Sequence, residues 1–238
     1  MITLFPCLSD NYGFLLHDPI TGLTAAIDTP DADEILRQCE SLGYTLTHVF
    51  NTHHHFDHVD GNAMLKENHG VTIIGPEADK ARIPNIDICV SGGEVFTFGS
   101  FDIHVLHTPG HTKGHCAYYI PALRSVFVGD TVFALGCGRM FEGTAEQMFA
   151  SIGKIAALPD ETQIYCAHEY TLANGAFAIS VDQNNVDLGI YLENAKKLRA
   201  QNMPTVPTTV LKEKRANPFM RAASASEFAR LRSAKDNF

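Results

Sequence analysis

The feature that most constrains this chain is a cluster of histidines and one aspartate that follows a β-type run. The run covers residues 47–50, and residues 52–58 then read THHHFDH. Alternate side chains of an extended segment point to the same side, so we expect His53 and His55 to face together and His54 to face away. Imidazole and carboxylate groups are good ligands for zinc-like cations. The cluster therefore predicts a metal site, and a solvated histidine-rich patch is the alternative.

Three further strand-like runs lead to possible ligands. Residues 101–107 alternate apolar and polar, which is the strand period, and they enter a Pro-Gly turn that carries His111. Residues 124–129 resemble a buried strand and precede Asp130, and residues 163–166 precede His168. Ligands at the carboxyl ends of several strands can converge on one edge of a sheet. The sequence therefore supplies matching ligands for the first cluster.

Taken in order, these motifs resemble the metallo-β-lactamase superfamily and, within it, the glyoxalase II (hydroxyacylglutathione hydrolase) family. The matching segments are THHHFDH, TPGHT, GDTVF, GCGRMFEGT, CAHEYT and the C-terminal FARLRSAKDNF. The resemblance runs over nearly the whole length and implies an α/β fold, a four-layer αββα sandwich followed by a mostly helical region. We therefore predict a catalytic domain at residues 1–169 and a helical, substrate-binding domain at residues 170–238.

The same resemblance assigns seven ligands to two divalent metal ions per chain. They are His53, His55 and His111 for one ion, Asp57, His58 and His168 for the other, and Asp130 as the bridge. We predict zinc, with iron and manganese as alternatives, because these ligands suit all three metals. Two such ions lie about 3.5–4 Å apart, share a water and lower its pKa. The resemblance also implies that Asp57 and Asp130 are catalytic residues.

The activity that the resemblance implies is hydrolysis of S-D-lactoylglutathione, and of related S-2-hydroxyacylglutathiones, to glutathione and D-lactate in methylglyoxal detoxification. A thioester releases a thiolate with a parent pKa of about 8.5, which can depart without a strong general acid. No separate acid stands beside these motifs, and this favours a thioester over an amide. The alternatives are another superfamily enzyme, such as a mononuclear iron persulfide dioxygenase or a lactonase, and a non-catalytic metal-binding or nucleic-acid-processing protein.

Substrate-binding residues are also implied by the family motifs. Glutathione carries two carboxylates, so its binder needs cationic groups and backbone donors. The residues are Arg139 and Phe141 in the GCGRMFEGT segment, Tyr170 after the late histidine, and Arg232 and Lys235 near the C-terminus. Some relatives carry Tyr at position 141, so Phe141 lacks a hydroxyl that could bind the peptide backbone of glutathione. The alternative for Arg232 and Lys235 is a solvated helix face.

Composition limits the possible partners and compartment. The formal net charge of the 238-residue chain is −9, which argues against a nucleic-acid partner. The six cysteines are scattered, which indicates reduced thiols in a cytoplasmic enzyme. No signal peptide opens the chain and no apolar run approaches 18 residues, so we expect neither export nor membrane association. We expect a monomer whose partner is the small-molecule thioester.

Local signals predict several helices. Asp31 and Glu34 are spaced as an N-terminal cap pair with Gly43 at the stop, and Thr144 with Gln147 forms a capping-box pattern. After residue 170, apolar residues recur at helical spacing between 188 and 198, and a capping pair at Ser224 begins a last helix.

Overall fold

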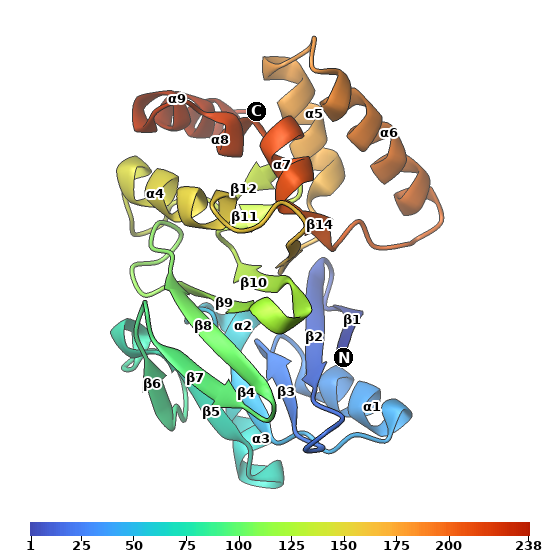
Figure 1. The fold of residues 1–238 in the computed structure, drawn as a ribbon, viewed down its shortest axis with the longest axis vertical. Coiled ribbons are helices and arrows are strands. Elements are labelled where there is room, and N and C mark those ends of the chain that lie inside the picture. Colours follow the sequence, from blue (N-terminus) through green and yellow to red (C-terminus); the bar gives the residue numbers. More distant parts are fainter. The chain divides into compact units, whose positions relative to one another are not determined.

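The computed structural model describes residues 1–238, which fall into two units. The first unit comprises residues 1–107 and 114–123, and the second comprises residues 108–113 and 124–238. Figure 1 follows the chain from the strand-rich N-terminal part to the helices that end it.

A six-stranded sheet is the frame of the first unit (Figure 1). Its strands, in spatial and sequence order, are β1 (Ile2–Cys7), β2 (Asn11–His17), β3 (Thr24–Ile27), β4 (His48–Phe50), β5 (Thr72–Pro76) and β6 (Ile88–Val90). The first three pair antiparallel, whereas β3 to β6 pair parallel. Parallel strands need crossover connections, and such sheets are buried on both faces.

Helices supply two of these crossovers and cover the sheet. They are α1 (Ala32–Leu42), the short α2 (Phe56–Val59) and α3 (Asn62–His69). Helix α1 begins as predicted, because the Asp31 side chain accepts a hydrogen bond from the Glu34 amide, and it ends at Gly43 in the left-handed region. Its buried Ile35 joins the core with Val49 of β4 and Ile73 of β5. Burial of this face fixes the helix on the sheet.

The first unit also contains an antiparallel meander. Strands β7 (Val95–Phe98), β8 (Phe101–His107) and β9 (Cys116–Ile120) pair in sequence order, with Val105 opposite Tyr118. Fully buried Tyr118 donates its hydroxyl proton to the Asn51 carbonyl at 2.7 Å. This contact ties the meander to the loop that follows β4.

The second unit contains three paired strands, a hairpin and six helices. Strand β10 (Ser125–Gly129) pairs parallel with β13 (Gln163–Cys166), and β13 pairs antiparallel with β14 (Thr208–Thr209). The hairpin is β11 (Val132–Phe133) with β12 (Gly136–Cys137). The helices are α4 (Ala145–Ala156), α5 (Thr171–Val181), α6 (Val186–Ala200), α7 (Val210–Ala216), α8 (Pro218–Arg221) and α9 (Ala225–Asp236).

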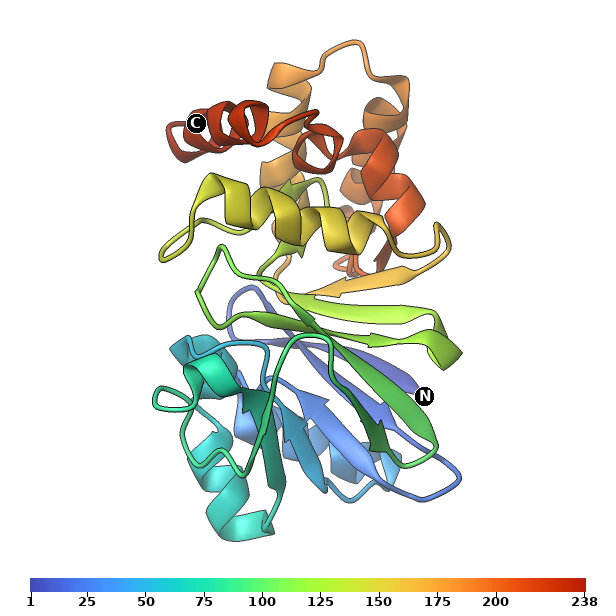
Figure 2. The same cartoon turned by 60° about the vertical axis from the view of Figure 1, so that its left-hand side comes forward.

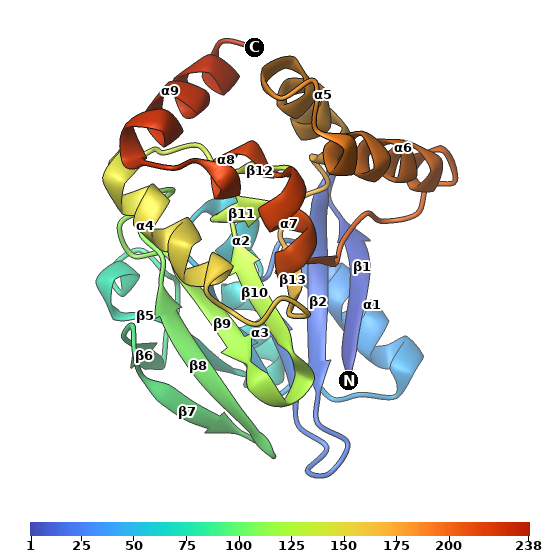
Figure 3. The same ribbon diagram turned by 45° about the horizontal axis from the view of Figure 1, so that its top comes forward.

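Two groups of packed helices organise this second unit. Helix α4 packs against α8 and α9, which lie above it in Figure 2. Helices α5 and α6 lie side by side, as Figure 3 shows, and α6 also contacts α7. Leu188 of α6, Ala178 of α5 and Ala216 of α7 meet Leu135 in one buried cluster. The predicted helical character after residue 170 is confirmed.

The structure also contains short elements that the sequence patterns did not predict. Strand β6 and the β11–β12 hairpin were not predicted, because their runs are only two or three residues long. Cys137 lies in strand β12. Helix α4 begins after Thr144 and ends at Ala156. The predicted Thr144–Gln147 capping box is present.

Candidate metal centre

The first unit places its candidate ligands at the carboxyl ends of parallel strands. Ile27 of β3 is level with Phe50 of β4, which is level with Ile74 of β5. The residues that follow these strands therefore leave the sheet at the same edge. Asp28 follows β3, the THHHFDH segment follows β4, and Asp79 lies shortly after β5.

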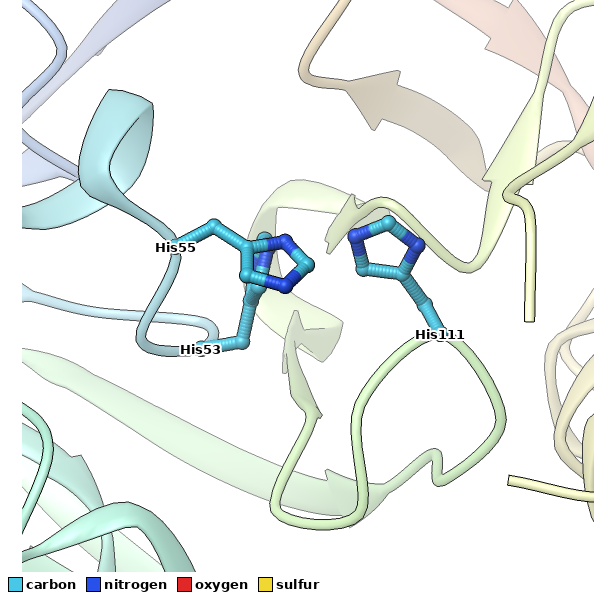
Figure 4. Close-up of side chains that lie close together, drawn as sticks. All are labelled: His53, His55 and His111. Carbon is cyan, nitrogen blue, oxygen red and sulfur yellow. The ribbon is translucent and has the colours of Figure 1, made fainter. Parts of the chain in front are cut away.

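His53 and His55 face together, as the sequence predicted. Nε2 of His53 lies 3.1 Å from Nδ1 of His55 (Figure 4). Two nitrogens bound at 2.0–2.1 Å to one tetrahedral cation would be about 3.3 Å apart. The Thr52 hydroxyl lies 3.0 Å from Nδ1 of His53 and 2.8 Å from Asp28 Oδ2. Since the hydroxyl donates to the carboxylate, it accepts from His53, whose Nε2 then carries the lone pair.

Asp28 is a buried residue of this region that sequence reasoning missed. Its Oδ1 accepts a hydrogen bond from the Thr52 amide at 2.7 Å, and its Oδ2 lies 2.8 Å from Nδ1 of His58. A carboxylate only accepts, so His58 keeps its proton on Nδ1 and its lone pair on Nε2. The signal was its place directly after a buried strand, the same place that marked Asp130.

Asp57 and His58 form the second pair of candidate ligands in this unit. They belong to helix α2, and Asp57 Oδ2 lies 3.5 Å from Nε2 of His58. Asn11, at the start of β2, donates to the same Oδ2 at 3.1 Å and to the Asp57 carbonyl at 3.3 Å. Asn11 therefore fixes the carboxylate, and nothing in the sequence had singled it out.

The remaining histidines of the cluster have other partners. Nδ1 of His54 lies 3.0 Å from a carboxylate oxygen of Asp79, whose side chain is fully buried and also pairs with Arg82. His115 is buried, and its ring stacks on His53 with centroids 4.9 Å apart. His54 thus turns away from His53 and His55, and His115 supports the His53 ring by packing.

The second unit holds three candidate ligands, and His111 and His168 both lie close to the third, Asp130. Strands β10 and β13 are parallel with Gly129 level with Cys166, so Asp130 and His168 emerge at the same edge. Oδ2 of Asp130 lies 3.3 Å from Nε2 of His111, and Oδ1 lies 3.5 Å from Nε2 of His168. Each oxygen of one carboxylate therefore faces a different imidazole, the arrangement expected of a bridging ligand.

His111 projects from the loop formed by residues 108–113 (Figure 4). Its Nδ1 donates to the Arg139 carbonyl at 2.7 Å, so its Nε2 carries the lone pair. A Cβ atom on Gly138 would lie 1.9 Å from the Asp130 carbonyl oxygen and 3.2 Å from Nδ1 of His111. Only glycine lets the backbone pass this close to the two ligands.

Two rings border the ligands of the second unit. Tyr170 stacks on His168 with centroids 4.8 Å apart and planes 2° from parallel. Phe141 meets His111 edge to face at 5.2 Å, and 61% of its surface is exposed. The Phe141 amide also donates to the His111 carbonyl at 3.2 Å. The segment that holds two expected substrate-binding residues is therefore attached directly to a candidate ligand.

The two cations expected from helix α9 differ in their surroundings. Arg232 is only 5% exposed, so it does not lie on a solvated helix face. Its guanidinium donates to the Cys137 carbonyl at 2.9 Å and to Asp236 at 2.8 Å. Half-buried Lys235 donates to the Ala173 carbonyl at 3.2 Å. Asp236 also lies 3.3 Å from Nε of Arg139. Sequence reasoning missed this carboxylate, which links the two arginines.

The buried cysteines are not activated. Burial raises the pKa of the Cys116 and Cys166 thiols to about 12, and that of the Cys137 thiol to about 11. A thiol with such a pKa is protonated at neutral pH and is a poor nucleophile or metal ligand. These three thiols therefore have no part in the proposed chemistry.

Comparisons with known proteins decide the family. Residues 21–168 match the metallo-β-lactamase superfamily, and residues 169–238 match the hydroxyacylglutathione hydrolase C-terminus. The chain is 52% identical over 231 residues to the hydroxyacylglutathione hydrolase of Maricaulis maris, covering 97% of this chain and 90% of that one. The chain belongs to the hydroxyacylglutathione hydrolase (glyoxalase II) family of the metallo-β-lactamase superfamily.

Further similarity supports this family and its fold. The chain is 49% identical over 251 residues to the hydroxyacylglutathione hydrolase of Brucella ovis, covering 100% of this chain and 98% of that one. The crystal structure of ETHE1 from Myxococcus xanthus matches with a TM-score of 0.76 and 28% identity, covering 98% of this chain and 90% of that one. The predicted α/β metallo-β-lactamase fold with a helical C-terminal region is confirmed.

Membership of this family makes the chain a thioester hydrolase, as the sequence motifs implied. The family and the grouped histidine and aspartate side chains support a divalent metal site. The donor chemistry fits, because the close pairs of candidate ligands join an imidazole nitrogen to another such nitrogen or to a carboxylate oxygen. None of the helices combines the length and apolarity that a membrane crossing demands.

Proposed function

We propose that this chain hydrolyses S-D-lactoylglutathione, and related S-2-hydroxyacylglutathiones, to glutathione and D-lactate, as a step in methylglyoxal detoxification. The observation that carries the proposal is Asp130, whose two carboxylate oxygens face Nε2 of His111 and Nε2 of His168. A purely structural zinc site closes four protein ligands around one ion and needs no such shared carboxylate. The substrate follows from the family, whose curated relatives carry the name hydroxyacylglutathione hydrolase.

We further propose two divalent metal ions per chain, zinc in the first place. The grouping follows the family pattern. It places His53, His55 and His111 on one ion, Asp57, His58 and His168 on the other, and Asp130 between them. When bound, such ions act as Lewis acids and lower the pKa of water toward neutrality. Iron or manganese would suit the same imidazole and carboxylate donors.

The chain's own residues prepare these donors. Hydrogen bonds at Nδ1 leave the Nε2 lone pairs of His53, His58 and His111 available. Asp57 is held by Asn11, and the negative charge of Asp130 offsets the repulsion between two cations. The leaving thiolate has a parent pKa of about 8.5, so it can depart without a general acid. The buried cysteines are therefore not needed as proton donors.

Recognition of glutathione is assigned to Arg139, Phe141, Tyr170, Arg232 and Lys235. Lys235 and Arg139 are the cations with exposed surface, so they suit direct contact with a carboxylate. Buried Arg232 suits a supporting role, because its guanidinium is engaged by Cys137 and Asp236. The exposed ring of Phe141 and the Tyr170 ring beside His168 suit contact with the acyl group or peptide.

The deciding experiment measures hydrolysis of S-D-lactoylglutathione by the purified, metal-loaded chain, with and without a chelator. Elemental analysis should give close to two metals per chain. A lactoyl thioester of 2-mercaptoethanol serves as the matched substrate without the peptide, and it should be hydrolysed with a much higher KM. Full metal loading without hydrolysis of any glutathione thioester would refute the proposal. One metal per chain would favour a mononuclear enzyme of the same superfamily.

We also propose a compartment and an oligomeric state for this chain. The six cysteines are scattered and none forms a disulfide, which suits the reducing cytoplasm, and we propose a monomer there. Sedimentation velocity at micromolar concentration should give a single species near 26.1 kDa.

A further inference from the structure

A cavity of about 320 Å³ lies within the second unit, between helices α6 and α7 and residues 204–207. Its inner wall is aliphatic, with Ala195 and Leu198 from α6, Val206 from the connecting segment and Ala216 from α7. Of these, Ala195, Val206 and Ala216 are buried. The residues assigned to metal ions and to glutathione do not line it.

The rim of the cavity is exposed, and part of it is apolar. Ile190 of α6 is 58% exposed and Leu211 of α7 is 36% exposed, and both line the opening. Soluble proteins commonly expose single large apolar side chains. Here two of them border an aliphatic cavity and form a small continuous apolar surface with it. The chain itself does not cover this surface.

Two cations stand at the same opening. Lys212 and Arg215 are three residues apart on α7, so they share one face of that helix, and both line the cavity. Neither forms an ion pair, whereas Lys214 between them on the chain pairs with Asp160 at 2.9 Å. Asp187 is the one carboxylate of the lining. The opening therefore has an excess of positive charge.

One wall of the cavity is held in place by buried hydrogen bonds. The Tyr191 hydroxyl lies 2.8 Å from Oε1 of Glu213 and 2.7 Å from the Thr208 hydroxyl. Glu213 is fully buried and also accepts from the Leu135 amide at 2.9 Å. The Tyr191 ring therefore has a fixed orientation, and a ligand that packs on it does not have to order the wall.

We propose that this cavity binds an unbranched aliphatic monocarboxylate of medium length. The alkyl chain would fill the aliphatic wall, and the carboxylate would lie between Lys212 and Arg215. A volume of about 320 Å³ holds roughly ten groups of about 30 Å³, the size of a water molecule or a methylene. The cavity therefore suits chains of about eight to ten carbons, and a cationic ligand would meet only Asp187.

The test uses a fluorescent reporter at the rim. The chain contains no Trp, so Ile190→Trp introduces a single indole beside the opening. Titration of the metal-loaded variant with carboxylates of four to twelve carbons should show saturable binding. Affinity should rise about fourfold for each added methylene and level off near ten carbons, where the cavity is full. Absence of saturable binding by any member of the series would overturn the proposal.

Variants in the same reporter background separate the two parts of the site. The double substitution Lys212→Gln with Arg215→Gln should weaken decanoate binding about ten- to hundredfold. Decanol lacks the carboxylate, so its affinity for the Ile190→Trp protein should be as low as that of decanoate for the double variant. Lys214→Gln is the matched control on the same helix and should change nothing. Equal affinity in the double variant and the control would overturn the ionic half of the site.

Filling the cavity tests the apolar half. Ala195→Leu adds three carbons to the buried wall and should abolish binding, and Leu198→Phe is a second filling variant if Ala195→Leu fails to fold. Unchanged affinity in a folded filling variant would place the ligand elsewhere. Sedimentation velocity provides the last comparison. The chain could instead form a dimer that binds no carboxylate and that Ala195→Leu dissociates. That result would make this surface a protein interface and would overturn the proposal.

Discussion

Oδ2 of Asp28 lies 2.8 Å from Nδ1 of His58. The same oxygen accepts a hydrogen bond from the Thr52 hydroxyl, and that hydroxyl accepts one from Nδ1 of His53. One buried carboxylate thus sets the tautomer of two proposed ligands, either directly or through one hydroxyl. Carboxylates in this position orient a histidine and raise its basicity toward a metal.

Asp28→Asn should weaken metal binding by about ten- to hundredfold. The amide oxygen can still accept from the Thr52 amide, but its NH₂ group would then donate to His58 and move the imidazole proton to Nε2. Chelator competition on the loaded protein measures the affinity, and nitrogen chemical shifts of His58 report the tautomer. Asp31→Asn is the matched control, because Asn also caps a helix. Equal affinity in both variants would remove this role from Asp28.

Asp130→Asn should lose at least one metal and lower kcat by two or more orders of magnitude, roughly 3 kcal/mol in the barrier. The substitution keeps the size of the side chain and removes the charge that faces His111 and His168. Metal content by elemental analysis and steady-state kinetics are the measurements. Asp102→Asn, on the exposed side of β8, should leave both unchanged. A variant with two metals and near-normal kcat would show that Asp130 is not the bridge.

Lys235→Ala should raise KM for glutathione thioesters and spare kcat, because contacts remote from the reacting carbon act equally on ground and transition states. One charge-assisted hydrogen bond corresponds to about one to two orders of magnitude in kcat/KM. Burial, followed by the nearby Arg232, lowers the pKa of Lys235. KM of the wild type should therefore rise with pH below the ordinary lysine range, and the variant should lack this rise. An unchanged KM would return Lys235 to a structural role.

Arg232→Ala should behave differently from Lys235→Ala. Arg232 is buried and holds the Cys137 carbonyl and Asp236, so its loss leaves polar groups unsatisfied and lowers the free energy of unfolding by about 1–3 kcal/mol. Urea unfolding and KM should both change, since Cys137 precedes the segment that carries Arg139 and Phe141. A raised KM with unchanged stability would instead make Arg232 a direct substrate contact.

Phe141→Tyr should lower KM for S-D-lactoylglutathione by about three- to tenfold, the value of one neutral hydrogen bond. The ring is largely exposed, so the added hydroxyl meets no steric barrier. Phe56→Tyr, which is also exposed, is the control and should leave KM unchanged. An identical KM in both variants would show that the missing hydroxyl does not weaken glutathione binding.

Glu213→Gln should destabilise the protein, because Thr208, Tyr191, Leu135 and Asn217 all donate to this carboxylate. Burial outweighs these donors and raises the pKa of Glu213 above its ordinary 4.5. The folded state thus favours the protonated form, so the stability of the wild type declines as pH rises from 4.5 through the raised pKa. The difference in unfolding free energy between wild type and variant should therefore shrink over this window. A constant difference in urea unfolding would contradict the raised pKa.

The sequence determined the chemistry of this protein because ligand types and strand patterns are local properties. Asp130 and His168 each follow an apolar run, and the parallel pairing of β10 with β13 places them at one edge. In the same way, the parallel pairing of β3 with β4 places Asp28 and the THHHFDH segment at one edge of the other sheet. The capping pairs at Asp31 and Thr144 likewise predicted where two helices begin. The several family motifs in order also fixed the fold, which periodicity alone did not distinguish from other α/β arrangements.

Only the tertiary structure decided which side chains support the ligands. Asp28 and Asn11 lie 30 and 46 residues from the groups they orient, and no spacing rule connects them. The same holds for Arg232, for which a solvated helix face was the alternative. Its side chain is buried and donates to the carbonyl of Cys137, 95 residues away. Burial and long-range hydrogen bonding depend on how distant segments pack, and a linear pattern of residues does not record that packing.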